Sequence, residues 1–128
     1  MIIGVGIDIV DIRRIDSLLQ KFGNHFLKKI YTADEVRFCT SRKNIAGSLA
    51  KMYALKEATL KAISDVKGIH WHDIEIRHDL NGCPRIELTG NALLNLHRKI
   101  ETYDIHATTS DEIKYAIAYV VIQSVPNG

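Results

Sequence analysis

Hydrophobic positions at the start of the chain change from a continuous run to a helical period. Residues 1–10 form a β-branched run of the kind found in buried strands, interrupted by two glycines and by Asp8. From residue 12 onward the apolar positions recur every three or four residues, as they do on one face of a helix. Because Asp11 is a suitable N-cap and Gly23 a suitable C-cap, the pattern predicts a strand followed by a helix.

Further helices are indicated before the middle of the chain. Residues 25–30 are typical of a short helical turn, and residues 32–35 have the spacing of a capping box. A polar loop is expected at residues 40–44. The apolar period that follows predicts one long helix over residues 45–63.

The second half of the chain has mainly a period of two. Residues 71–79 alternate polar and apolar side chains, which predicts a half-buried strand with His70 and His72 on the same face as Ile74. The Asn-Gly pair that follows is a strong hairpin signal. The pattern then predicts a partner strand at residues 84–88, a second amphipathic helix at residues 91–103, and closing strands at residues 104–110 and 114–125.

Length and composition indicate a single globular domain. A chain of 128 residues can bury one core without staples, so we expect one domain over residues 1–128. Helices and mostly antiparallel strands occur in separate blocks, which favours the α+β class. The chain has 46% hydrophobic and 25% charged residues, as globular proteins do. No apolar run approaches the ~20 residues that span a membrane.

Charge and cysteine content narrow the expected partners and compartment. The net charge of +2 is too small to indicate nucleic acid. Basic residues nevertheless crowd the first thirty positions, which suits an acidic partner or an ordinary solvated helix face. Two isolated cysteines indicate neither a disulfide framework nor a zinc site, and the N-terminus lacks a basic leader, so a cytoplasmic protein is expected. The basic residues are Arg13, Arg14, Lys21, Lys28 and Lys29.

Two features of the pattern suggest chemistry. Asp8 is the only charged residue among the first ten, where it is either a buried carboxylate that needs a partner or metal, or a polar residue at a turn. In the long predicted helix, Lys56 falls within the apolar stripe, which suggests a buried or interface ion pair. Glu57 and Lys61 lie four residues apart and form either an ordinary surface pair or the wall of a site.

The second interpretation of Glu57 and Lys61 has a specific chemical content. Small residues beside the pair (Ala50, Ala54 and Ala58) would leave room for a ligand or another chain. Asp8 and Glu57 together are plausible hard oxygen ligands for Mg²⁺, which takes one or two carboxylates plus phosphate and water. Lys61 would then meet a phosphate as a point charge.

Several segments, in the same order along the chain, resemble the holo-[acyl-carrier-protein] synthases, the small 4′-phosphopantetheinyl transferases. They are GVGIDIVDIRRI at residues 4–15, FLKKIYTADE at residues 26–35, LAKMYALKEATLKAI at residues 49–63, WHDIEIRHDLNGCPRIEL at residues 71–88 and YAIAYVVI at residues 115–122. The most specific parts are the G-x-D segment around Asp8 and the K-E-A-x-x-K motif that ends at Lys61.

The resemblance implies a 4′-phosphopantetheinyl transferase-like α+β fold and a transfer reaction. The phosphopantetheine arm of coenzyme A would move to a serine of apo acyl carrier protein, releasing adenosine 3′,5′-bisphosphate. Asp8 and Glu57 would hold Mg²⁺, Glu57 and Lys61 would be the catalytic residues, and Lys61, Thr108 and Ser110 would contact coenzyme A. The serine proton could pass to Glu57, a water or another carboxylate, and the sequence leaves these alternatives open.

The resemblance also implies partners. The acidic carrier protein would contact Arg14, with Arg13 and Lys21 as further contacts. The reaction would take place in the cytoplasm, as part of fatty acid biosynthesis and lipid metabolism. Relatives of this size resemble homotrimers with active sites at subunit interfaces. Neither nucleic acid nor a membrane is an expected partner.

The chain departs from the family pattern at two basic positions. Where family members usually read G-R-F-A-A-K-E-A, this chain reads KMYALKEA, so that Met52 replaces an arginine. Asp111 stands where the family usually has a histidine. Both departures concern the nucleotide end of coenzyme A. Two other functions therefore remain open: a non-catalytic carrier-binding module with impaired coenzyme A binding, and a Mg²⁺-dependent phosphohydrolase acting on nucleotides.

Overall fold

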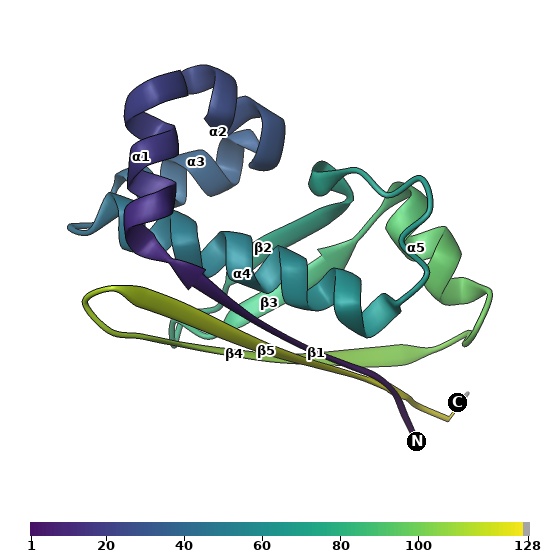
Figure 1. The fold of residues 1–128 in the computed structure, drawn as a ribbon. Helices are drawn as coiled ribbons and strands as arrows, with labels where there is room; N and C mark the ends of the chain where they lie inside the picture. Colours follow the sequence, from purple (N-terminus) through teal and green to yellow (C-terminus); the bar gives the residue numbers. More distant parts are fainter. Residues whose placement is uncertain (127–128) are drawn as a thin grey trace.

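A long helix, α4 (Ile45–Ile63), lies across one face of a three-stranded antiparallel sheet in the computed structural model (Figure 1). The strand order is β1 (Ile2–Asp11), β5 (Tyr115–Ser124), β4 (Tyr103–Asp111), which makes β1 and β4 the two outer strands. The structure describes residues 1–126. The single-domain prediction for residues 1–128 includes residues 127–128, which lie outside the described part.

Small residues allow α4 to approach the sheet closely. A Cβ atom on Gly6 of β1 would lie 1.7 Å from the backbone oxygen of Ala58, so only glycine fits there. Ala54 and Ala58 of α4 are fully buried. The expectation that these alanines leave room for a ligand is therefore wrong, because the sheet covers them.

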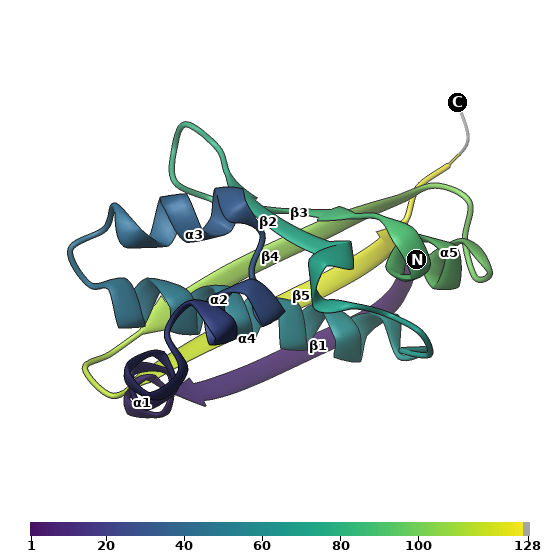
Figure 2. The same cartoon turned by 90° about the horizontal axis from the view of Figure 1, so that it is seen from above.

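The remaining elements surround α4 (Figure 2). A two-stranded antiparallel hairpin packs along α4 on the β4 side, where β3 contacts β4 (Figure 2). Three short helices gather near the N-terminal end of α4, and a fifth helix lies near its C-terminal end (Figure 1). These elements are β2 (Ile74–His78) and β3 (Pro84–Leu88); α1 (Ile12–Phe22), α2 (Asn24–Ile30) and α3 (Ala33–Thr40); and α5 (Gly90–His97).

The core contains a buried ion pair. Lys56 Nζ of α4 lies 2.9 Å from Glu35 Oε1 of α3, and both side chains are 0% exposed. Lys56 also donates to the backbone oxygens of Trp71 and Ile74. The pair ties α3, α4 and the start of β2 together, which confirms the buried ion pair suggested for Lys56.

Most helices and strands agree with the sequence-based expectations. The bounds of α4 match the prediction, Asp11 caps α1 through the backbone N–H of Arg13, and Thr32 forms the expected capping box with Glu35. Two expectations are wrong. Residues 71–73 form a 3-10 turn rather than part of a strand, and the helix predicted over residues 91–103 ends at residue 97.

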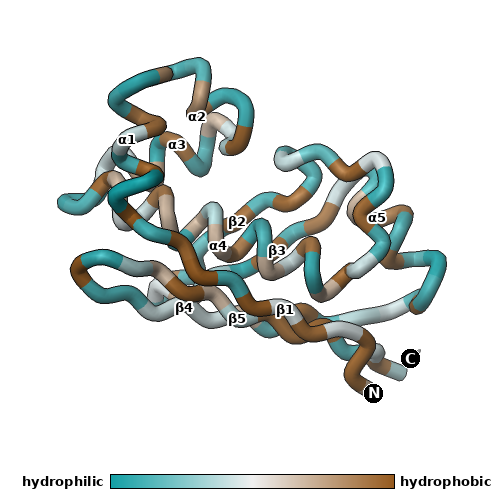
Figure 3. Tube along the Cα trace, viewed as in Figure 1, coloured by the Kyte–Doolittle hydropathy of each residue, from teal (hydrophilic) through white to brown (hydrophobic). Residues whose placement is uncertain are grey.

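The sheet face opposite α4 is open, and its exposed positions on β1 and β5 are largely apolar. Hydrophobic residues recur along β1 in the hydropathy-coloured chain trace (Figure 3). Ile7 and Ile9 of β1 are 56% and 62% exposed, and Ile117 and Tyr119 are their direct neighbours on β5. The expectation that the N-terminal run is a buried strand is therefore only half right, because β1 buries one face alone. Within residues 1–126, none of the helices is long and apolar enough to cross a membrane.

Candidate active site

Asp8 and Lys61 meet beside the outer strand β1. Asp8 lies in the middle of β1, on the face that packs against α4, and its side chain is 17% exposed. Lys61 Nζ lies 3.3 Å from Asp8 Oδ1 and donates to the backbone oxygen of Ile7 at 2.9 Å. Of the two interpretations of Asp8, the partnered carboxylate is thus the one observed. Lys61 pairs across to β1, and its spacing from Glu57 does not produce an ordinary helix-surface ion pair.

Glu57 lies one turn before Lys61 on α4, and Tyr53 one turn before Glu57. Tyr53 is half-buried, with its ring 5.4 Å from that of Trp71. Burial raises the pKa of Tyr53, and a side-chain hydrogen bond with Glu57 together with the charge of that carboxylate raises it further. The charge of Arg14 lowers the pKa of Tyr53 and the charge of Asp8 raises it, both by less than Glu57 does. We call Asp8, Glu57 and Lys61 the carboxylate cluster.

The carboxylate cluster offers some, but not all, of the ligands that a magnesium ion needs. Its two carboxylates are the hard oxygen donors that Mg²⁺ prefers. Within residues 1–126 no group of three or more His, Cys, Asp or Glu side chains could hold a metal. Two carboxylates therefore fit a metal that completes its coordination with phosphate oxygens and water, as Mg²⁺ does in phosphoryl-transfer sites.

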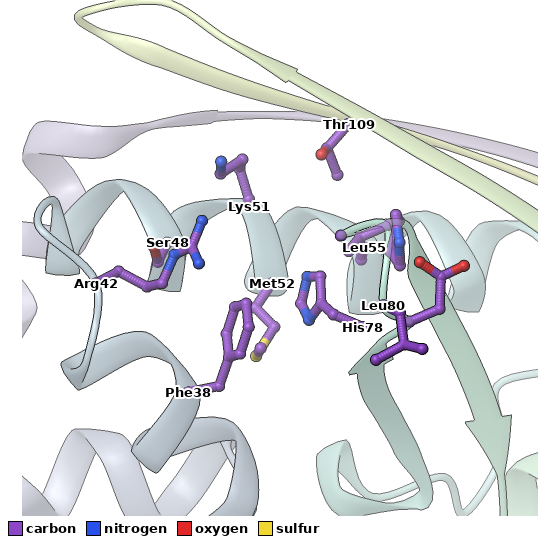
Figure 4. Close-up of a pocket in the computed structure, with 12 residues that line it drawn as sticks. Phe38, Arg42, Ser48, Lys51, Met52, Leu55, His78, Leu80 and Thr109 are labelled. Carbon is purple, nitrogen blue, oxygen red and sulfur yellow. The ribbon is translucent and has the colours of Figure 1, made fainter.

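A pocket of about 360 Å³ lies on the other flank of α4, between α3, the β2–β3 hairpin and β4 (Figure 4). We call it the β4-edge pocket. The rings of Phe38 and His78 stack at 4.0 Å, and the Arg42 guanidinium lies 5.2 Å from the Phe38 ring. Lys51 and Thr109 border the pocket from α4 and β4 (Figure 4).

One departure from the family pattern lines the β4-edge pocket, and the other pairs with a residue that lines it. Met52 lines it but is buried, with its sulfur 3.8 Å from Cys39 Sγ. Asp111 Oδ1 lies 3.6 Å from Lys51 Nζ, so the acidic replacement pairs with the lysine beside it. The two basic side chains expected from the family pattern are thus absent, and the positive charge of Lys51 is balanced by Asp111.

The other charged or titratable groups that line the β4-edge pocket are His78, Asp79 and Arg42, and no ion pair of Arg42 is found within residues 1–126. Burial lowers the pKa of His78, and the nearby charges of Arg42 and Lys51 lower it further. His78 is therefore neutral at pH 7, below which its ordinary pKa already lies. Asp79 forms an ion pair with Arg85 at 3.1 Å.

The structure does not bring all predicted site residues together within one chain. Asp8, Ala118 and Thr109 form one cross-strand row beneath α4, with Asp8 on one outer strand and Thr109 on the other. Thr108 and Ser110 are exposed and point to the opposite face of the sheet. The predicted coenzyme A contacts at these two residues are thus separated from the carboxylate cluster by the sheet itself.

The basic residues of α1 differ in their availability. Arg13 is held by Asp11 through an ion pair of 2.7 Å. Arg14 and Lys21 are exposed and lie seven residues apart, on one face of α1. Leu18, which lies between them in the sequence, and Phe22, which follows Lys21, line an open pocket of about 410 Å³ that also includes Tyr53 and Lys29. This face of α1 is therefore apolar at its centre and basic at its rim, next to the carboxylate cluster.

Comparison with known proteins assigns the family. Residues 4–120 match the model of the 4′-phosphopantetheinyl transferase superfamily, and the chain belongs to that family. Curated relatives are named holo-[acyl-carrier-protein] synthase. The protein from Halothermothrix orenii is 42% identical to this chain, and the match covers 94% of this chain and 97% of that protein. The protein from Sinorhizobium fredii is 38% identical, and the match covers 98% of this chain and 94% of that protein.

Solved structures agree with the family assignment. The holo-(acyl-carrier-protein) synthase of Bacillus anthracis in complex with CoA (3′,5′-ADP) has a TM-score of 0.80 and 29% identity, covering 98% of this chain and 99% of that one. The synthase of Helicobacter pylori in complex with coenzyme A has a TM-score of 0.80 and 31% identity, covering 93% of this chain and 99% of that one. The fold class and the enzyme class expected from the resemblance are confirmed.

Sequence reasoning missed the residues that shape the β4-edge pocket. Phe38, Arg42 and His78 come from α3, the loop after it and β2, and no motif links them. Tyr53 carried a usable signal, since it lies four residues before Glu57 on the same helix face.

Proposed function

We propose that the protein transfers the 4′-phosphopantetheine arm of coenzyme A to a serine of apo acyl carrier protein. The observation that carries this proposal is the carboxylate cluster, in which Asp8 of β1 meets Lys61 of α4 one turn from Glu57. The similarity to holo-[acyl-carrier-protein] synthases along nearly the whole chain supports it, including similarity to structures solved with coenzyme A.

In the proposed reaction the serine hydroxyl of the carrier attacks the phosphorus that bears pantetheine. A phosphorus–oxygen bond to the serine forms, the pyrophosphate bond breaks, and adenosine 3′,5′-bisphosphate leaves. Lys61 meets the negative charge that spreads over the phosphate oxygens, and positioning and charge stabilisation contribute most of the rate. The serine proton is taken up by Glu57, a water or another carboxylate.

Asp8 and Glu57 are the residues that would hold Mg²⁺. When bound, the ion would supply charge stabilisation to the pyrophosphate oxygens. Asp8 already shares its carboxylate with Lys61, so the lysine keeps that side chain directed toward α4 and Glu57. Tyr53 supports Glu57 from the opposite side.

The proposed site is completed by a second copy of the chain in a homotrimer. The carboxylate cluster lies at the β1 side of α4 and the β4-edge pocket at the β4 side, so within one chain the two lie on opposite flanks of that helix. Head-to-tail contacts that place one chain's β1 side against another's β4 side close into a ring. The open apolar face around Ile7, Ile9 and Ile117 supplies the surface that such contacts would bury.

The trimer is tested by light scattering coupled to gel filtration. The wild-type protein should have three times the mass of one chain. Ile9→Lys should dissociate it, since a charge would enter the buried interface, and transfer activity should be lost with it. The exposed control Leu94→Lys on α5 should stay trimeric and active. A fully active monomer would exclude a site shared between subunits.

The carrier protein is proposed to bind the face of α1 that carries Arg14 and Lys21. Arg14→Glu should lower kcat/KM for the carrier by about tenfold and weaken its dependence on salt, because charge complementarity acts mainly on association. Lys67→Glu, an equal charge change in the loop after α4, is the control and should have little effect. Equal effects of both variants would argue against docking at α1.

The transferase proposal is tested by mass spectrometry of the carrier. The protein is incubated with apo acyl carrier protein, coenzyme A and Mg²⁺, and the carrier should gain one phosphopantetheine. An unmodified carrier, under conditions in which a known transferase modifies it, would overturn the proposal. Carrier binding without Mg²⁺-dependent coenzyme A affinity would indicate a binding module. Product release from coenzyme A without carrier would indicate a phosphohydrolase.

Glu57→Gln tests the role of the carboxylate cluster. The variant should fold normally, because Glu57 lies outside the core, and should lose nearly all turnover and Mg²⁺ binding measured by calorimetry. Glu112→Gln, at the exposed β4–β5 turn, is the matched control and should retain both. Near-normal rates for Glu57→Gln would remove Glu57 from the site.

The proposal also includes the cellular setting. Cys39 and Cys83 are free thiols, as is usual in the reducing cytoplasm. We place the activity there, in fatty acid biosynthesis, where carrier proteins require their phosphopantetheine arm.

A further inference from the structure

The β4-edge pocket has the parts of a site for a purine nucleotide, and within residues 1–126 its cation Lys51 and its anion Asp79 are each held in an ion pair. Its stacked Phe38 and His78 rings and the adjacent Arg42 offer aromatic and planar cationic surfaces to a base. Ser48 and Thr109 contribute hydroxyl groups at its border. A volume of about 360 Å³ lies within the range of small-molecule sites.

Where Lys51 meets Asp111, the charges favour a hydroxyl group over a phosphate. Lys51 lines the pocket, and its ammonium group lies 3.6 Å from the Asp111 carboxylate of β4. A phosphate that approached Lys51 would therefore also approach a negative charge. A ribose hydroxyl would instead donate a hydrogen bond to that carboxylate.

Apart from Lys51, Arg42 is the cation that the pocket lining contributes within residues 1–126. His78 is neutral at pH 7, because burial and the two nearby cations lower its pKa. Met52, which replaces the basic residue expected from the sequence pattern, presents a thioether that packs on Cys39. Arg42 keeps its positive charge, and its guanidinium lies over the Phe38 ring, 5.2 Å from the ring centre.

We propose that Asp111 is a specificity-determining residue that makes the protein accept a nucleotide with a free ribose 3′-hydroxyl. The protein would use 3′-dephospho-coenzyme A about as well as coenzyme A. This rests on the proposed transferase function and assigns its substrate class more closely. The same chemistry distinguishes dinucleotide sites, where an acidic residue binds a ribose hydroxyl and an arginine accommodates a phosphate.

The experiment compares both substrates with wild-type protein and two variants. The measured quantity is the ratio of kcat/KM for coenzyme A to kcat/KM for 3′-dephospho-coenzyme A. For the wild type this ratio should be below about ten. Asp111→Asn should raise the ratio at least about fivefold, which is the scale of one charge interaction near a protein surface. Asp104→Asn is the matched control: it removes the same charge from the other end of β4, more than a Debye length away, and should leave the ratio unchanged.

A binding measurement keeps the inference separate from the transferase proposal. Adenosine 3′,5′-bisphosphate and adenosine 5′-monophosphate are titrated into each protein by calorimetry, without carrier. The wild type should bind them with affinities within about tenfold, and Asp111→Asn should favour the bisphosphate by at least about fivefold.

The outcomes decide the two proposals independently. Three results would each overturn the role of Asp111. The first is a wild-type preference of tenfold or more for coenzyme A and for the bisphosphate. The others are equal shifts in Asp111→Asn and Asp104→Asn, and the absence of any nucleotide binding. Equal binding of both nucleotides without any transfer would leave that role intact and overturn the transferase function.

Discussion

The buried pair of Glu35 and Lys56 provides the sharpest prediction about stability. Lys56→Met keeps most of the side-chain volume but removes the ammonium group, which lies 2.9 Å from Glu35 Oε1. Glu35 would keep the backbone N–H groups of Thr32 and Ile76, at 2.8 and 2.7 Å, but would lose its countercharge. The backbone oxygen of Ile74, now 2.7 Å from Nζ, would lose a donor.

The expected loss follows from the burial of both partners. Removing one member of a buried ion pair leaves the other charge uncompensated in a medium of low dielectric, which costs about 3–5 kcal/mol. A domain of this size typically unfolds with 5–15 kcal/mol. The melting temperature should therefore fall by about 10–20 °C.

Urea unfolding at one fixed protein concentration measures this loss. Trp71 is the only tryptophan, and its backbone oxygen accepts a hydrogen bond from Lys56, so its fluorescence reports on the altered region. Lys67→Met, on an exposed lysine, is the control and should change the free energy of unfolding by less than about 0.5 kcal/mol.

A second variant tests whether the uncompensated charge is the cause. Glu35→Gln combined with Lys56→Met removes both charges and should recover about 1–2 kcal/mol relative to Lys56→Met alone. A loss below about 1 kcal/mol in Lys56→Met would refute the argument. So would a double variant whose loss equals or exceeds the sum of the two single losses.

Gly6→Ala should cost about 3 kcal/mol in thermal unfolding experiments, because its Cβ would enter the backbone of Ala58; an unchanged melting temperature would contradict this close approach. His78 has a lowered pKa in the folded state, so the unfolded chain binds more protons below about pH 6.5 and stability should fall as the pH drops. His78→Phe should lose less stability than the wild type between about pH 7.5 and about pH 5.5 in urea titrations, and identical losses would show that His78 does not contribute. Tyr53→Phe should lower kcat by about tenfold with little change in KM for coenzyme A, since only the hydroxyl that supports Glu57 is removed; an unchanged kcat would exclude that support.

Local features of the fold could be predicted because the physical cause lies within a few residues. Helix α4 was predicted from its apolar period, and the capping box at Thr32 from residue types three positions apart. The 3-10 turn at residues 71–73 was not predicted, since its alternation of residue types imitates a strand. There the backbone N–H of His70 donates to the Asp73 carboxylate, and the backbone N–H of Asp73 donates to the backbone oxygen of His70. The ring Nε2 of His72 lies 3.1 Å from the backbone oxygen of Tyr31.

The candidate site likewise has features that local sequence predicts and features that depend on how distant residues pack. Sequence reasoning found Glu57 and Lys61 because they share a helix face, and it singled out Asp8 as a charge in an apolar strand. That Lys61 pairs with Asp8 depends on how α4 lies across β1. The alanines beside this pair looked like free space in the sequence, yet the sheet covers them.

The sequence alone determined the order of helices and strands, the family and the residues that carry charge. It also indicated that Lys56 needed a buried partner, since a lysine in an apolar stripe must be compensated. Only the tertiary structure decided that this partner is Glu35, that Asp111 balances Lys51, and that Phe38 and His78 stack at one pocket. Contacts between residues far apart in the chain depend on how helices and strands pack, and no local pattern of residue types specifies that packing.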